Sequence, residues 1–214
     1  KERVRTLENK QAALIDENEA LKAHADQIQA QLAQAKKESD KLTRLVGDLR
    51  SEQEKMLQQR RELEKLVQGL SGITVQPRSE GNFIVMESKI LFASGKADLN
   101  DEAKTTLDRV AGYLLEHPDL QIRVDGHTDG VPIKYSGWQD NYQLAAMRAH
   151  SVMRYLVEKG VDPARMYITG FGPNRPLVEP EEPTAPVDEN RRVEILLVPE
   201  GMRSISEILK GFGQ

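Results

Sequence analysis

The amino-acid sequence predicts an α/β sandwich that is preceded by a long coiled-coil helix. Three observations carry this prediction. An apolar residue recurs at every seventh position of the first 70 residues, which is typical of a coiled-coil seam. The later residues alternate short apolar runs with amphipathic helical patterns. All 10 Pro and all but two Gly also follow residue 70. We therefore expect a stalk at 1–70 and a folded domain at 71–214.

The seven-residue repeat of the first region is unbroken. Its members, assigned to the d position, are Leu7, Leu14, Leu21, Ile28, Ala35, Leu42, Leu49, Met56, Leu63 and Leu70. The a position is weaker, because polar residues such as Asn18 interrupt it. Leu at d with a buried Asn at a favours a parallel dimer in fixed register. We therefore expect a dimerising stalk about 100 Å long, at about 1.5 Å per residue. The sequence leaves open whether the stalk also receives a partner helix.

The second region reads as strands alternating with helices. Short strands are expected at 83–86 and 90–92. A helix follows Asn100, which can cap it ahead of two acidic residues. The pattern then predicts a strand at 120–124, a polar loop at 128–140, a helix at 141–159, strands at 166–168 and 193–198, and a tail helix at 204–211. An irregular loop at 172–189 contains five Pro.

Composition limits the classes of function. The chain of 214 residues has no Cys, which excludes disulfides and thiolate chemistry. A net charge of −4 gives no sign of nucleic-acid binding. No run of about 18 apolar residues is present. The chain begins at Lys1 rather than Met, and we expect a membrane-anchoring segment that is absent from this chain.

Several polar residues stand where a purely structural interpretation gives them little to do. Gly126-His127-Thr128-Asp129 directly follows a predicted strand, in the region where open sheets hold their ligands. Asn141 and Arg148 are two helical turns apart and therefore share a helix face. Asn190-Arg191-Arg192 precedes the last strand. An Asp and several Arg that meet in one groove would suit a zwitterionic ligand, since a guanidinium pairs with a carboxylate through two parallel hydrogen bonds.

These motifs resemble the signature of the OmpA/MotB C-terminal domain family. The matching segments are Phe92-Ala93-Ser94-Gly95-x-Ala97-x-Leu99, Gly126-His127-Thr128-Asp129, Asn141-x-x-Leu144, Arg148-Ala149 and Asn190-Arg191-Arg192-Val193-Glu194. The resemblance covers about 75–199. The stretch from Asp129 to Ile133, with the long loop before Asn141, is similar to the flagellar-stator (MotB-like) branch.

The resemblance implies a β-α-β-α-β fold that binds peptidoglycan non-covalently, chiefly through the diaminopimelate residue of the stem peptide. It implies that Asp129 takes the ammonium group and that Arg148 takes the carboxylate. The remaining members of the implied site are Asn141, Thr128, Gly130 and either Arg191 or Arg192. From the residues alone, Arg192 could instead form an ion pair within the fold, and His127 is better explained as a packed side chain than as a ligand.

Three functions remain in competition at this point. The first is a cell-wall-binding module on a dimeric stalk, located in the periplasm and tethered to a membrane. The second is an enzyme, but the spacing of His117, His127, His150 and Asp129 matches no known metal-ligand pattern. The third is a stator-type subunit of an ion-driven motor, whose transmembrane part is missing here and whose membrane partner would bind upstream. We expect no catalytic activity, cofactor, metal or nucleic-acid partner.

Overall fold

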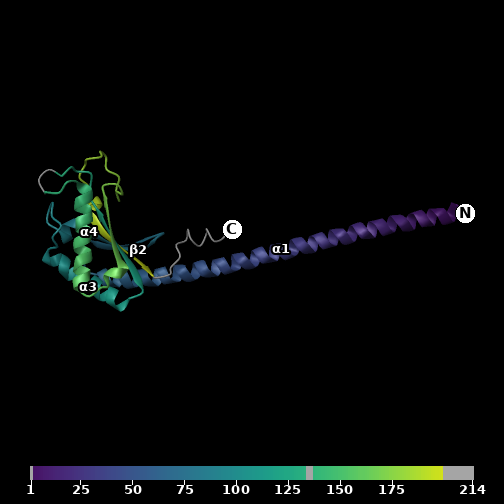
Figure 1. Cartoon of the computed structure of the whole chain (residues 1–214), viewed down its shortest axis with the longest axis horizontal. Helices are drawn as coiled ribbons and strands as arrows, with labels where there is room; N and C mark the ends of the chain where they lie inside the picture. The colour runs from purple at the N-terminus through teal and green to yellow at the C-terminus, as the bar shows by residue number, and fades with distance from the viewer. Residues whose placement is uncertain (1, 134–136, 200–214) are drawn as a thin grey trace. The chain divides into compact units, whose positions relative to one another are not determined.

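The computed structural model describes residues 2–133 and 137–199 (Figure 1). The chain forms two units, Lys1–Ser51 and Glu52–Gln214. The elements are α1 (Glu2–Val67), β1 (Ile73–Arg78), β2 (Gly81–Glu87), α2 (Ser88–Leu91), α3 (Asp101–Glu116), β3 (Leu120–His127), α4 (Asn141–Glu158), η1 (Pro163–Arg165), β4 (Met166–Gly172), η2 (Asp188–Asn190) and β5 (Arg192–Pro199). The predicted tail helix at 204–211 lies outside the described residues.

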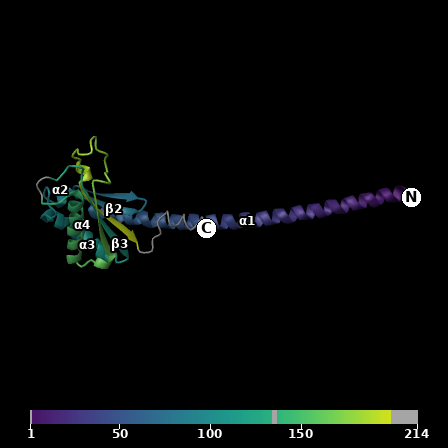
Figure 2. The same cartoon turned by 45° about the horizontal axis from the view of Figure 1, so that its top comes forward.

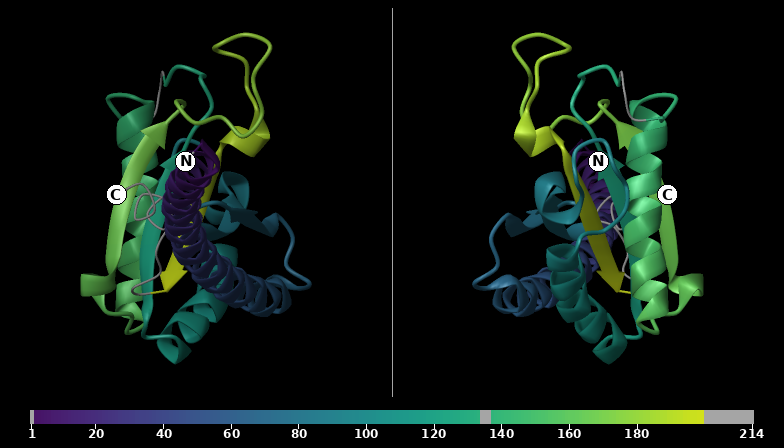
Figure 3. Two further views of the ribbon diagram at one scale, coloured as in Figure 1. Left: turned by 90° about the vertical axis from the view of Figure 1, so that its right-hand side faces the viewer. Right: turned by 90° about the vertical axis from the view of Figure 1, so that its left-hand side faces the viewer.

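A five-stranded mixed sheet organises the second unit. Its strand order is β1-β2-β5-β3-β4, with β3 and β4 parallel and the other neighbours antiparallel. Helix α4 runs along β3 and β4 (Figures 2 and 3). This close approach requires Gly126, because a Cβ there would lie 2.0 Å from the Ala145 carbonyl oxygen. The contact holds the end of β3 against the first turns of α4.

Helices α3 and α4 begin at side-chain caps. Asn100 Oδ1 accepts a hydrogen bond from the Ala103 backbone N–H at 2.7 Å, and Asp140 does the same for Gln143 at 2.7 Å. Such caps satisfy backbone donors that have no partner within the helix. The helix after Asn100 is therefore confirmed, and α4 occupies nearly all of the predicted 141–159 segment.

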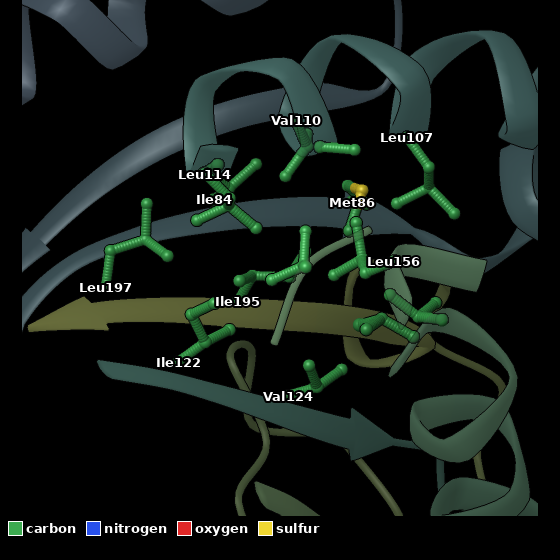
Figure 4. Close-up of a cluster of buried hydrophobic side chains, with 14 of the residues drawn as sticks. Ile84, Met86, Leu107, Val110, Leu114, Ile122, Val124, Leu156, Ile195 and Leu197 are labelled. Atoms are coloured by element: carbon green, nitrogen blue, oxygen red, sulfur yellow. The ribbon is translucent and has the colours of Figure 1, made fainter. Parts of the chain in front are cut away.

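One apolar core lies between the sheet and the helices (Figure 4). Its fully buried members include Ile84 and Met86 of β2, Leu107 and Leu114 of α3, Ile122 of β3, Leu156 of α4 and Ile195 of β5. Alternate residues of the strands face away from this core, and three of them, Phe83, Val85 and Leu196, form a second, smaller cluster. The predicted α/β fold with a preceding long helix is confirmed.

The last turns of α1 belong to the second unit. Leu63 is fully buried in the main core. Asn82 donates to the Met56 carbonyl at 2.9 Å and to Gln59 Oε1 at 2.7 Å. The unit thus begins at Glu52, inside the helix, whereas the sequence pattern suggests a boundary near residue 71. The reason is that Leu63, a member of the heptad series, packs within its own chain.

Two local expectations differ from the structure. The strand expected at 90–92 is wrong, because Ser88–Leu91 forms the short helix α2, and Phe92 makes only an isolated bridge with Leu99. Strand β1 was not expected, since Gln76 and Pro77 interrupt its apolar pattern. Proline is tolerated there because β1 is the edge strand of the sheet.

In the described part of the chain, no helix has both the length and the apolar character needed to cross a membrane.

Candidate functional site

A cavity of about 450 Å³ opens where β3 ends and α4 begins. Its wall includes Asp129 from the loop after β3, Asn141 and Arg148 from α4, and Arg191 from the turn before β5. Helix α2 and the segment that follows it close the other side through Ser88, Phe92 and Lys96. Four residues singled out in the sequence thus share one cavity, although up to 62 positions separate them along the chain.

Asp129 places a carboxylate in the cavity wall. The side chain is buried, with 6% of its surface exposed. Its Oδ2 accepts from Arg191 Nη1 at 3.1 Å, and its Oδ1 accepts from the Val131 backbone N–H at 3.3 Å. These two bonds fix the direction of the carboxylate toward the cavity.

Arg148 supplies the opposite charge from α4. It is 4% exposed, and its Nε donates to the Lys96 carbonyl at 3.0 Å. Its Nη1 donates to Ser88 Oγ at 3.3 Å, and the guanidinium lies 5.1 Å from the centre of the Phe92 ring. Burial lowers the pKa of Arg148 to about 10, with a further decrease from Arg191 and an opposing effect of Asp129. Arg148 therefore remains charged at neutral pH.

The two consecutive arginines before and at the start of β5 point to different places. Arg191 lines the cavity, is 41% exposed, and pairs with both Asp129 and Asp188. Arg192 is buried elsewhere: its Nε donates to Glu194 at 2.6 Å, and its Nη2 donates to the Arg175 carbonyl at 3.1 Å. Arg192 does not line the cavity, so of the two arginines implied by the resemblance only Arg191 faces it. The physical reason is that Arg191 ends the helical turn η2, with φ −85° and ψ 89°, whereas Arg192 is the first residue of β5, so their side chains leave the backbone in different directions.

The loop residues on either side of Asp129 reach two hollows. Thr128 lines the cavity of Asp129 and also a neighbouring hollow of about 510 Å³ beneath the proline-rich loop. Gly130 lines only the second hollow, and a Cβ there would lie 1.8 Å from the Pro183 carbonyl oxygen. Both loops leave the same end of the sheet, where α4 begins (Figure 3). Glycine at 130 is thus required for the two loops to pack.

Asn141 holds the far side of the first loop. Its Nδ2 donates to the Val131 carbonyl at 2.9 Å. Trp138 joins the loop before α4 to the segment after α2, because its indole N–H donates to the Gly95 carbonyl at 2.8 Å. Tyr135, the other aromatic residue of this loop, lies outside the described residues. The Asn141 bond to the loop means that this side chain shapes the cavity as well as lining it.

Sequence reasoning missed Ser88, which orients Arg148, and gave no role to Phe92 and Gly95 within their motif. Phe92 and Gly95 could have been found, because an aromatic residue and a glycine stand out within this motif. Ser88 precedes the motif, and only the fold brings it to Arg148.

Comparison with known proteins gives a family and several relatives. The profile of the OmpA family matches residues 91–191. The outer-membrane lipoprotein YfiB of Pseudomonas aeruginosa is 33% identical over 120 residues, which are 56% of this chain and 68% of YfiB. The chain spans about half the length of the first curated relatives it matches, which are motility proteins.

Two solved structures resemble the fold. A putative MotB-like protein from Desulfovibrio vulgaris has a TM-score of 0.64 and 27% identity, covering 71% of this chain and 98% of that one. The cell wall anchor of the T6SS from Pseudomonas aeruginosa has a TM-score of 0.56 and 26% identity, covering 64% of this chain and 97% of that one.

Proposed function

The chain belongs to the OmpA family, and from this premise we propose that its second unit binds bacterial peptidoglycan without cleaving it. The ligand group is the free end of a diaminopimelate residue in the stem peptide. Asp129 receives its ammonium group, and Arg148 receives its carboxylate.

One observation carries this proposal: a buried carboxylate and a buried guanidinium line the same cavity. An amino acid end carries one positive and one negative group, so two fixed opposite charges can select it in one orientation. Such charge-assisted hydrogen bonds are stronger in a partly desolvated cavity than in water. The bonds of Arg148 to Lys96 and Ser88 hold the guanidinium in place before the ligand arrives, which reduces the entropy lost on binding.

Arg191 has a second role in this proposal. Without a ligand it pairs with Asp129, and its exposed side chain can swing aside or share the carboxylate. When the ammonium group binds Asp129, the freed guanidinium, which lines the same cavity, adds a contact to the ligand's carboxylate. The cavity thus exchanges an internal ion pair for ligand contacts instead of leaving a buried charge unpaired.

The first unit is proposed to dimerise through its apolar stripe. Leu7, Leu14 and Leu21 are each more than 60% exposed in the single chain. Contact with a second copy would remove these side chains from water at heptad spacing. The seam would end before Glu52, because Leu63 is already buried in its own chain. A dimeric, membrane-anchored stalk would tether the membrane to the cell wall, as the likeness to an outer-membrane lipoprotein supports.

A stator-type subunit of an ion-driven motor is the second candidate, which the likeness to MotB-like proteins favours. The discriminating observation is the N-terminal sequence of the whole gene product. A transmembrane helix with a single acidic residue would support the motor function, and a lipid-attachment signal would argue for a passive tether.

Binding is tested by co-sedimentation of the whole chain with insoluble peptidoglycan. We expect wild type and the charge-matched control Asp119→Asn, a change in an exposed turn, to sediment with the polymer. We expect Asp129→Ala and Arg148→Ala to stay in the supernatant while circular dichroism shows an intact fold. Full retention of both cavity variants would defeat the proposal.

A further inference from the structure

A second charged pocket, of about 260 Å³, lies on the sheet face opposite the main core. Its charged wall consists of Arg78, Arg123, Arg175, Arg192, Glu80, Asp125 and Glu194, and we call it the rear pocket. Along β3, Ile122 and Val124 enter the core, so the intervening residues and His127 face the rear pocket. The function proposed above makes no use of these residues.

The two buried carboxylates of the rear pocket are already engaged. Glu194 accepts from Arg78 through both of its oxygens, at 2.6 and 2.7 Å, and from Arg192 Nε at 2.6 Å. Asp125 accepts from Arg123 Nε at 2.9 and 2.8 Å. Each carboxylate therefore has strong, charge-assisted bonds without any ligand.

Positive charge remains in excess after this pairing. Four guanidiniums face three carboxylates, so one positive charge is in excess; Asp125 and Glu194 are buried, and Glu80, 3.4 Å from Arg123, is half exposed. Arg175 forms no ion pair among the described residues, and its guanidinium lies 4.1 Å above the Phe171 ring. An unbalanced charge beside a partly buried wall favours an ion of opposite sign.

His127 supplies an independent sign of a missing partner. It is 2% exposed, lines the rear pocket, and neither of its ring nitrogens has a hydrogen-bond partner in the described structure. Its ring stacks on the ring of Phe171, with 5.2 Å between the two centroids. Arg175 contacts the same Phe171 ring and lines the same pocket. A buried N–H without an acceptor destabilises the fold, so an acceptor in the pocket would remove that cost.

A cation is the competing occupant, because Asp125, His127 and Glu194 hold three candidate ligand atoms within 4.8 Å of one another. A cation there would have to displace arginines from Glu194 and would meet the repulsion of four guanidiniums. An anion meets the reverse situation, since it adds to the unpaired donors and leaves the existing ion pairs intact. The charges therefore select the anion.

We propose that the rear pocket is a binding site for a phosphate group. Guanidiniums approach it from β1, β3, β5 and the segment after β4, and a tetrahedral anion offers acceptors in several directions at once. The volume of the pocket admits such a group. The site is separate from the cavity of Asp129, although the consecutive residues Arg191 and Arg192 line one each.

The test is calorimetric titration of the whole chain with inorganic phosphate at neutral pH in a phosphate-free buffer. We expect saturable binding that Arg175→Ala weakens by about tenfold or more, as the loss of a charged hydrogen bond predicts. The matched control is Arg109→Ala, an exposed arginine of α3 that removes the same charge away from the pocket, and we expect it to change affinity by less than about twofold.

A second readout does not depend on a variant. The side-chain nitrogen resonances of His127 should shift on adding phosphate, while those of exposed His24 should not. A parallel titration with glycerol phosphate separates free phosphate from phosphate carried on a larger molecule. Binding of either compound that requires Arg175 and shifts His127 supports the site. Absence of binding by both, or equal loss in Arg175→Ala and Arg109→Ala, overturns it.

Discussion

Replacing Asp129 by Asn tests the role of the cavity carboxylate with little change of shape. The substitution removes one negative charge but keeps an oxygen that can accept the 3.3 Å bond from the Val131 backbone N–H. An ammonium group bound there would lose its charged partner at a residue that is only 6% exposed. Removing one member of such a pair costs about 2–3 kcal/mol, which corresponds to a loss of affinity of about 30- to 150-fold.

The assay is calorimetric titration of the whole chain with a diaminopimelate-containing stem peptide. Asp119→Asn serves as the control, because it removes the same charge from an exposed turn before β3. Thermal unfolding of both variants checks that the fold persists. An affinity of Asp129→Asn within about threefold of the control would refute the assignment of the ammonium to this carboxylate.

Three further predictions follow from the contacts. Arg148→Lys keeps the charge but loses the fork that binds a carboxylate through two bonds, so stem-peptide affinity should fall by about tenfold; an unchanged affinity in the same titration would contradict this. In sedimentation at micromolar concentration, the chain should be a dimer and Leu21→Glu a monomer, because burying each leucine contributes about 2 kcal/mol; a monomeric wild type would contradict this. Burial and the neighbouring Arg192 lower the pKa of His127 to about 3, so the unfolded state takes up its proton first as pH falls below about 6.5. The free energy of unfolding should therefore drop by about 1–2 kcal/mol between pH 6.5 and 5, and denaturant titrations in which His127→Gln shows the same drop would contradict this cause.

The sequence was sufficient where periodicity and capping act locally. The heptad series predicted the long helix, and Asn100 followed by two acids predicted the start of α3. These signals need only residues that are close along the chain. Strand β1 was not predicted because its pattern contains Pro77, and because the pairing that stabilises it comes from β2.

The limits of the sequence appear where partners are distant. The heptad rule cannot tell that Leu63 packs in its own core while Leu21 remains exposed, because both occupy the same repeat position. Likewise, the motif gave Arg191 and Arg192 equal standing. Only the fold directs Arg191, at the end of η2, to Asp129 and Arg192, at the start of β5, to Glu194.

The charge environment of His127 was also invisible in the sequence. Arg192 of β5 lies opposite His127 in the pairing of β3 with β5, and the side chain of Arg78 from β1 bonds Glu194 beside it. The sequence predicted a packed histidine, and it is buried. It could not show that both ring nitrogens would lack a partner among the described residues.

Paired titrations of the whole chain with two stem peptides test whether the cavity recognises both charged groups of an amino-acid end. The peptides differ only in carrying diaminopimelate or lysine, so the second lacks the carboxylate meant for Arg148. We expect the lysine peptide to bind at least about tenfold more weakly, since the guanidinium would face no anion. Equal affinities for the two peptides, or no affinity for either, would contradict it.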